Sequence, residues 1–152
     1  MAGLLKRNAT WVWMPIVVGL LFPPLALTLI QSSEGEMLRT LGGYFLPVSD
    51  EPLWIVPLRM IWNLVPFAAI FLGAYLISRG KKPNRVRAAS LFGTLGAMAV
   101  FIVFYSDARA ALDAERWTAS AIATGTAPLY ALPVALIMFG LGVLAGSSAR
   151  GA

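Results

Sequence analysis

Apolar residues dominate four long runs of this 152-residue chain, and polar residues gather in the short stretches between the runs. The runs cover roughly residues 10–30, 54–78, 88–105 and 119–144. A helix rises about 1.5 Å per residue, so runs of roughly 18 to 26 residues match a hydrocarbon layer about 30 Å thick. The pattern therefore predicts an all-α, polytopic membrane protein in which residues 1–152 form one domain, a small bundle of four transmembrane helices.

Prolines interrupt three of these runs. Pro23 and Pro24 lack the backbone N–H that a helix interior needs, so we expect the first helix to kink there. Pro66 lies inside the second run, and Pro128 and Pro133 lie inside the fourth. The first run also follows a basic start, as in a secretory signal peptide, but it is too long for one and has no clear cleavage site. We therefore interpret it as a transmembrane helix.

Two of the connections carry helical signals of their own. In the connection 31–53, the stretch Ser33–Glu36 fits a capping box, which predicts a short helix lying at the membrane interface. An ordinary ordered loop is equally compatible with this stretch. The connection 106–117 is rich in Ala and spaces Arg109 and Asp113 four residues apart, which predicts a short exposed helix.

Small residues recur at four-residue spacing in two runs. Ala89, Gly93 and Ala97 fall on one face of the third helix, and Gly142 and Gly146 lie near the end of the fourth. Small side chains allow two membrane helices to approach closely. We therefore expect these five positions to be helix-packing sites, either within the chain or in a dimer.

The distribution of charge predicts the orientation. Eight of the twelve Lys and Arg residues, and none of the seven acids, lie before the first run, between the second and third, or after the fourth. Basic residues beside membrane helices are retained on the cytoplasmic side, so we expect both termini to be cytoplasmic in a bacterial-type inner membrane. The same basic turn is the expected contact for anionic phospholipids, through Arg79, Lys81, Lys82, Arg85 and Arg87.

Composition excludes several classes of function. Hydrophobic residues make up 59% of the chain and charged residues only 12%, so the net charge of +5 is a feature of membrane flanks rather than of a nucleic-acid surface. The sequence has no Cys and no His, which excludes thiolate chemistry, histidine-ligated metals and histidine-dependent nucleophiles. We expect neither a cofactor nor enzymatic activity.

One charged residue lies at membrane depth. Arg59 is followed one turn later by Asn63, and counting from Trp54 places them about 8 and 13 Å below the interface. Thr124 and Thr126 reach a similar depth on the fourth run, so Arg59, Asn63, Thr124 and Thr126 are a candidate polar cluster. The alternative is that Arg59 extends its side chain back to the interface or donates to carbonyls freed by proline.

Two functions remain compatible with this pattern. The first is an accessory or structural subunit of a larger membrane assembly, because such a protein needs only packing faces and a stable topology. Its partners would be other membrane subunits, in a homo- or hetero-oligomer, and anionic phospholipids. The alternative is an oligomeric channel or small transporter for an anionic or polar solute, centred on Arg59 and Asn63.

Overall fold

The computed structural model describes residues 2–31, 41–42, 44–46, 52–80 and 82–148, with side chains described from residue 8 onward. Four long helices account for most of this part of the chain: α1 (Ala2–Gln31), α3 (Ile55–Ser78), α4 (Pro83–Asp113) and α5 (Trp117–Ser148). Each is long and apolar enough to span a membrane. The prediction of an all-α bundle with four membrane-spanning helices is confirmed.

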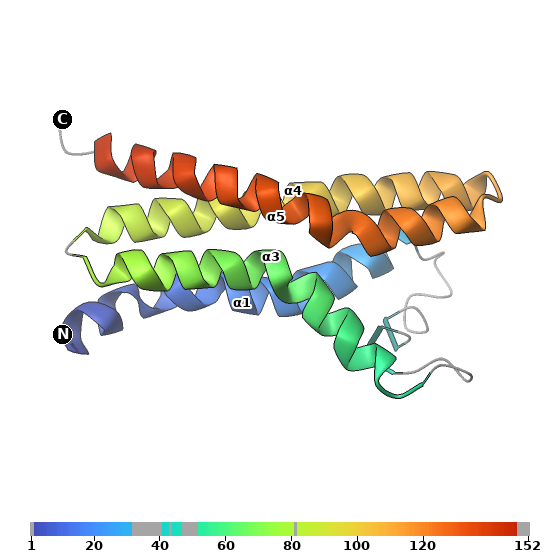
Figure 1. Cartoon of the computed structure of the whole chain (residues 1–152), viewed down its shortest axis with the longest axis horizontal. Coiled ribbons are helices and arrows are strands. Elements are labelled where there is room, and N and C mark those ends of the chain that lie inside the picture. Colours follow the sequence, from blue (N-terminus) through green and yellow to red (C-terminus); the bar gives the residue numbers. More distant parts are fainter. Residues whose placement is uncertain (1, 32–40, 43, 47–51, 81, 149–152) are drawn as a thin grey trace.

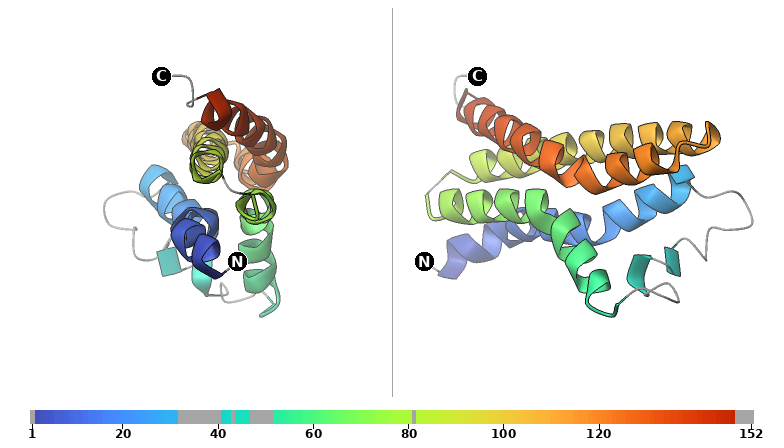
Figure 2. Two further views of the ribbon diagram at one scale, coloured as in Figure 1. Left: turned by 90° about the vertical axis from the view of Figure 1, so that its left-hand side faces the viewer. Right: turned by 45° about the vertical axis from the view of Figure 1, so that its right-hand side comes forward.

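The helices alternate in direction along the bundle. The start of α1, the turn between α3 and α4, and the end of α5 lie at one end, which we call the basic end (Figure 1). The end of α1, the start of α3 and the turn between α4 and α5 lie at the opposite end. Helices α4 and α5 form the most extensive contact, and α1 and α3 pack beside them (Figure 2).

Helix α4 is longer than the sequence pattern predicts. It continues through the expected break at residue 105 to Asp113, so the predicted short exposed helix is the last part of α4 itself. The expected pair forms there, with Arg109 Nη2 3.0 Å from Asp113 Oδ1. Helix α1 likewise begins before residue 10, and α5 extends beyond 144. The predicted interfacial helix lies mostly outside the described residues, although 41–42 and 44–45 are helical.

The end of α4 has a defined geometry. The N–H of Arg116 donates to the carbonyl of Ala111 and the N–H of Glu115 donates to that of Leu112, which together form a Schellman motif. Glu115 takes the left-handed conformation that this motif requires, with φ 58°. Glycine usually occupies this position because it has no Cβ. Glu115 stands there instead, so the sequence gives no signal for this turn.

Aromatic rings fill the middle of the bundle. Phe67 of α3 stacks on Phe101 of α4 with ring centroids 5.9 Å apart, and Phe101 meets Tyr105 edge-on at 5.6 Å. All three side chains are fully buried, and alanines of α5 at positions 127, 131 and 135 close the other side of this core. The four-residue spacing of these alanines places them on one face of α5, against α4.

The predicted small residues lie at helix contacts within the chain. Ala89, Gly93 and Ala97 are buried. A Cβ added to Gly142 would lie 2.5 Å from the carbonyl oxygen of Ala88, and one added to Gly146 would lie 2.7 Å from the Cα of Arg85. The backbones of α4 and α5 therefore touch near the basic end, where a side chain larger than hydrogen does not fit.

Proline bends the helices at the opposite end. Helix α3 contains Pro66, and its first half swings away from the rest of the bundle (Figure 1). Helix α5, which contains Pro128 and Pro133, also bends but stays beside α4. Proline removes a backbone hydrogen bond and clashes with the preceding turn, which accounts for both bends. The diverging half of α3 leaves a cavity beside α5.

Candidate functional site

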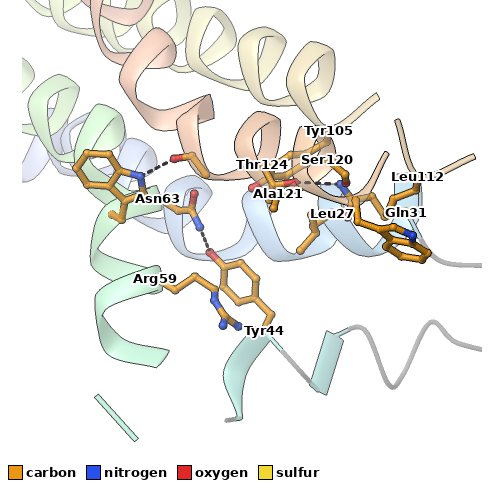
Figure 3. A pocket seen from close by; sticks show the side chains of 13 residues that line it. Leu27, Gln31, Tyr44, Arg59, Asn63, Tyr105, Leu112, Ser120, Ala121 and Thr124 are labelled. Carbon is orange, nitrogen blue, oxygen red and sulfur yellow. Dashed lines mark hydrogen bonds between the residues drawn. The ribbon is translucent and has the colours of Figure 1, made fainter. Parts of the chain in front are cut away.

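A cavity of about 530 Å³ lies at the end opposite the basic end, and all four long helices contribute to its walls. Aromatic and aliphatic side chains form much of the wall, and hydroxyl, amide and guanidinium groups interrupt it (Figure 3). The lining residues are Leu27, Gln31, Tyr44, Arg59, Trp62, Asn63, Tyr105, Leu112, Trp117, Ser120, Ala121, Thr124 and Gly125. Apolar walls with a few polar groups are typical of small-molecule sites.

Helix α3 supplies three of the lining side chains from one face. Trp62 and Asn63 come three and four residues after Arg59, so the three side chains project from neighbouring turns on one side of the helix. Pro66 comes directly after this stretch, at the bend that carries the first half of α3 away from α5. The bend thus turns a packed helix face into one wall of a cavity.

Asn63 is held by a residue from outside the four long helices. Its Nδ2 donates to the hydroxyl of Tyr44 over 2.8 Å, and both side chains are buried (Figure 3). Burial raises the pKa of Tyr44 above its usual value, and the Asn63 hydrogen bond and the charge of Arg59 act weakly in the opposite direction. Tyr44 therefore keeps its proton at neutral pH and remains a hydrogen-bond donor as well as an acceptor.

Hydrogen bonds join three helices at the rim of the cavity. Arg109 of α4 donates through Nη1 to the carbonyl of Gln31 over 2.8 Å. Because Gln31 is the last residue of α1, the guanidinium charge meets the negative end of that helix dipole. The side chain of Gln31 in turn donates to the hydroxyl of Thr124 of α5 over 3.4 Å.

A second contact links α3 directly to α5. The indole Nε1 of Trp62 donates to the carbonyl of Gly125 over 2.9 Å. Trp62, Ala121 and Gly125 are all exposed. The side of the cavity between α3 and α5 therefore lies at the surface of the bundle rather than in its core.

The hydroxyl of Tyr105 is the one buried polar group of the cavity wall that has no hydrogen-bond partner among the described residues. The side chain is fully buried, and its ring rests on Phe101. A buried donor without a partner typically costs about 1–3 kcal/mol. A water molecule in the cavity is enough to supply such a partner.

The structure brings together three of the four residues of the predicted polar cluster. Arg59, Asn63 and Thr124 line the cavity. Thr126 is not among the lining residues, because it comes two residues after Thr124 and so projects from the opposite side of α5. Its hydroxyl donates to the carbonyl of Ile122 in its own helix over 2.8 Å. Threonine commonly forms this bond inside a helix, and it competes with contacts to other helices.

Sequence analysis missed the two tyrosines. Tyr44 lies in a connection, and only the folded chain places it beside Asn63. Tyr105 was taken as the end of the third apolar run, whereas α4 continues for two more turns and buries it. The spacing of Phe101, Tyr105 and Ala108 along one helix face was the available signal for its burial.

The predicted lipid-contact residues gather at the basic end. Arg79 and Arg87 are exposed and lie over aromatic rings, Arg79 over Tyr75 at 5.1 Å and Arg87 over Trp11 at 4.8 Å. Lys82 is exposed and Arg85 half-buried, while Lys81 lies outside the described residues. These cations flank the membrane-spanning stretches, where lipid head groups would meet them.

No group of three or more His, Cys, Asp or Glu residues that could hold a metal ion occurs in the described part of the chain. Comparison with models of known protein families, with curated proteins and with solved structures finds no match for this chain. The residues and their geometry are therefore the basis for a functional interpretation.

Proposed function

We propose that this four-span membrane protein is a non-enzymatic accessory subunit of a larger membrane protein assembly. In this proposal it resides in a bacterial-type inner membrane with both termini in the cytoplasm, because the basic end carries the Lys and Arg residues that are retained there. Its partner is another integral membrane protein, and anionic phospholipids contact the basic end.

The observation that carries the proposal is the outward face of α5. Only 17% of an 18-residue apolar stretch of α5 is buried inside the bundle, against 44% of the corresponding stretch of α4. The exposed face combines bulky side chains with a small residue: Ile137 and Leu144 are 64% exposed, and a Cβ added to Gly140 would meet nothing within 4 Å. A notch between large apolar residues fits the side chains of a neighbouring helix, whereas contact with lipid alone needs no such shape.

The proposal is tested by extraction in a mild detergent followed by native mass determination. We expect the 16.3 kDa chain to migrate with at least one further protein chain. A monomer without any partner chain under these conditions would contradict the subunit assignment.

A matched pair of substitutions locates the contact. Gly140→Trp fills the notch on α5 and should release the partner, while the melting temperature of the isolated chain should not fall, because a Cβ at this position meets nothing within 4 Å. Ala99→Trp places the same ring on the exposed side of α4 and should leave the assembly intact. Equal retention of the partner by both variants would show that the α5 face is turned to lipid.

An anion or polar-solute channel is the second candidate function, and the cavity is the observation that favours it. Arg59, Asn63 and Thr124 gather in one space, as a solute site requires. The fully buried rings of Phe67 and Phe101 fill the bundle beyond Tyr105, so a path through a single chain would need these rings to move. Anion flux into liposomes that is lost in Arg59→Ala but not in a matched exposed variant, Arg116→Ala, would favour the channel over the subunit.

A further inference from the structure

Most of the polar side chains in the cavity wall already interact within the protein. Asn63 donates to Tyr44, and the side chain of Gln31 donates to Thr124. Arg59, the cation among the described lining residues, also has an interaction within the protein. A ligand that displaced these contacts would gain little net free energy, because each new hydrogen bond would replace an existing one. The wall therefore favours a ligand that needs few hydrogen bonds.

The hydroxyl of Tyr105 is an unpaired donor in this wall. It has no hydrogen-bond partner among the described residues, and its side chain is fully buried. A phenol donates one hydrogen bond, which a carbonyl oxygen can accept. A carbonyl is neutral, so it brings no charge that would need a counter-charge in a largely apolar space. This donor therefore fits an uncharged ligand that carries a carbonyl oxygen at its buried end.

The exposed side of the cavity indicates that such a ligand comes from the membrane. Trp62, Ala121 and Gly125 line the cavity between α3 and α5, and all three are exposed. The apolar side chains of Ile61 and Ile122, on the same two helices, are 62% and 60% exposed. A hydrocarbon tail that lies over them stays in an apolar environment while its polar end occupies the cavity. A lipid-soluble ligand therefore has a direct route of entry.

The size of the cavity limits how much of a lipid can enter. About 530 Å³ is within the range of small-ligand pockets, roughly 300–1,000 Å³. A quinone ring, or a glycerol unit with its two ester groups, is small enough for this space, while long tails must stay outside. Tyr44, Trp62 and Trp117 add flat apolar surface to the wall, against which either group can pack.

We propose that this cavity binds the carbonyl-bearing end of an uncharged lipid from the membrane leaflet at the α4–α5 turn, and that the hydroxyl of Tyr105 donates to the carbonyl oxygen. The carbonyl belongs to the ester of a diacylglycerol or to the ring of a quinone, since both are neutral and carry an apolar tail. This site requires neither a partner subunit nor a path through the bundle, so it is independent of both candidate functions.

The test changes the protein and the ligand together. The full chain, delipidated in detergent, is titrated with dioctanoylglycerol and with its ether analogue dioctylglycerol, which has no carbonyl. A quinone with a short isoprenoid tail is titrated in a second arm. Binding is followed by native mass spectrometry and by thermal unfolding, in the wild type, Tyr105→Phe and Tyr130→Phe. Tyr130 is 57% exposed and stacks on Phe104 outside the cavity, so its variant controls for the loss of a phenol hydroxyl.

We expect the wild type to bind the ester about three- to tenfold more tightly than the ether, since one neutral hydrogen bond contributes about this much. Tyr105→Phe should lose this preference and Tyr130→Phe should keep it. Binding of the quinone, weakened in Tyr105→Phe alone, would assign the carbonyl to a quinone rather than to a glycerolipid. A bound quinone should then quench tryptophan fluorescence less in Trp117→Phe, at the cavity, than in Trp13→Phe, which is outside the lining.

Three results would overturn the proposal. If neither the ester nor the quinone binds saturably, water alone is the partner of Tyr105. If every ligand that binds does so equally in the wild type and in Tyr105→Phe, the hydroxyl is no part of the site. Tighter binding of dioctanoyl phosphatidylglycerol than of dioctanoylglycerol would show that the cavity prefers a charged lipid.

Discussion

The backbone contact between α4 and α5 makes a prediction that one methyl group can test. In Gly142→Ala the added Cβ would lie 2.5 Å from the carbonyl oxygen of Ala88 and 2.7 Å from the Cα of Ala89. Both are backbone atoms of α4, so neither can move aside as a side chain does. The two helices must separate along this contact, and α5 must lose part of its packing against α4.

The magnitude follows from a comparison with Gly140→Ala, two residues earlier on the same helix. A Cβ there meets nothing within 4 Å. Both variants replace Gly by Ala inside a helix, so the gain in helix propensity of about 1 kcal/mol is common to them. The difference between the two is therefore the overpacking cost, about 1–3 kcal/mol. For a chain of this size a difference of 2 kcal/mol corresponds to roughly 4–8 °C in melting temperature.

The assay is thermal unfolding of both variants and the wild type in one detergent, followed by circular dichroism. We expect Gly140→Ala at or above the wild-type melting temperature and Gly142→Ala below that of Gly140→Ala. Gly146→Ala should behave as Gly142→Ala does, because its Cβ also meets the backbone of α4, at 2.7 Å from the carbonyl oxygen of Asn84. Equal melting temperatures for the 140 and 142 variants would refute backbone contact between α4 and α5.

Three further predictions concern the ends of the helices. Glu115→Gly should raise stability by about 1 kcal/mol in the same assay, because glycine adopts the left-handed conformation of this exposed turn without steric cost, whereas Ala110→Gly in the interior of α4 should lower it by a similar amount. Arg109→Ala should cost about 1–2 kcal/mol and Asp113→Ala only about 0.5 kcal/mol, because Arg109 also holds the end of α1; equal losses would reduce its role to the surface ion pair. Reporters inserted near Asn84 or fused after Ser148 should read cytoplasmic, and one inserted near Ala114 should read external; the reverse pattern would contradict the orientation predicted from the basic residues.

The fold was largely predictable from the sequence, since four apolar runs of spanning length leave few alternatives to a helical bundle. The ends of the helices were not. Charged residues such as Asp107 and Arg109 directly after an apolar run are typical of a loop. Helix α4 nevertheless continues, because its alanines and the Arg109–Asp113 pair stabilise further turns. The stop comes only at Glu115, where a residue other than glycine forms the turn.

The candidate site was predictable only in part. Counting residues along the helices predicts a similar membrane depth for Arg59, Asn63 and Thr124, and the structure places all three around one cavity. Counting along a helix gives no information about a tyrosine in a connection, so the contact between Tyr44 and Asn63 could not be predicted. Depth alone also placed Thr126 in the cluster, although the helical period puts a residue two positions after Thr124 on the opposite side of α5.

The short turn between α4 and α5 has a consequence for biogenesis. Only residues 114–116 separate these two helices, so the most extensive contact in the bundle joins segments that leave the ribosome together. Contacts between neighbouring segments form early because little chain entropy is lost in closing a short loop. Helices α1 and α3 are synthesised first, and their contacts with α4 and α5 can form only after this hairpin has entered the bilayer. Asn63 can form its hydrogen bond before the hairpin is inserted, because its partner, Tyr44, has already been synthesised.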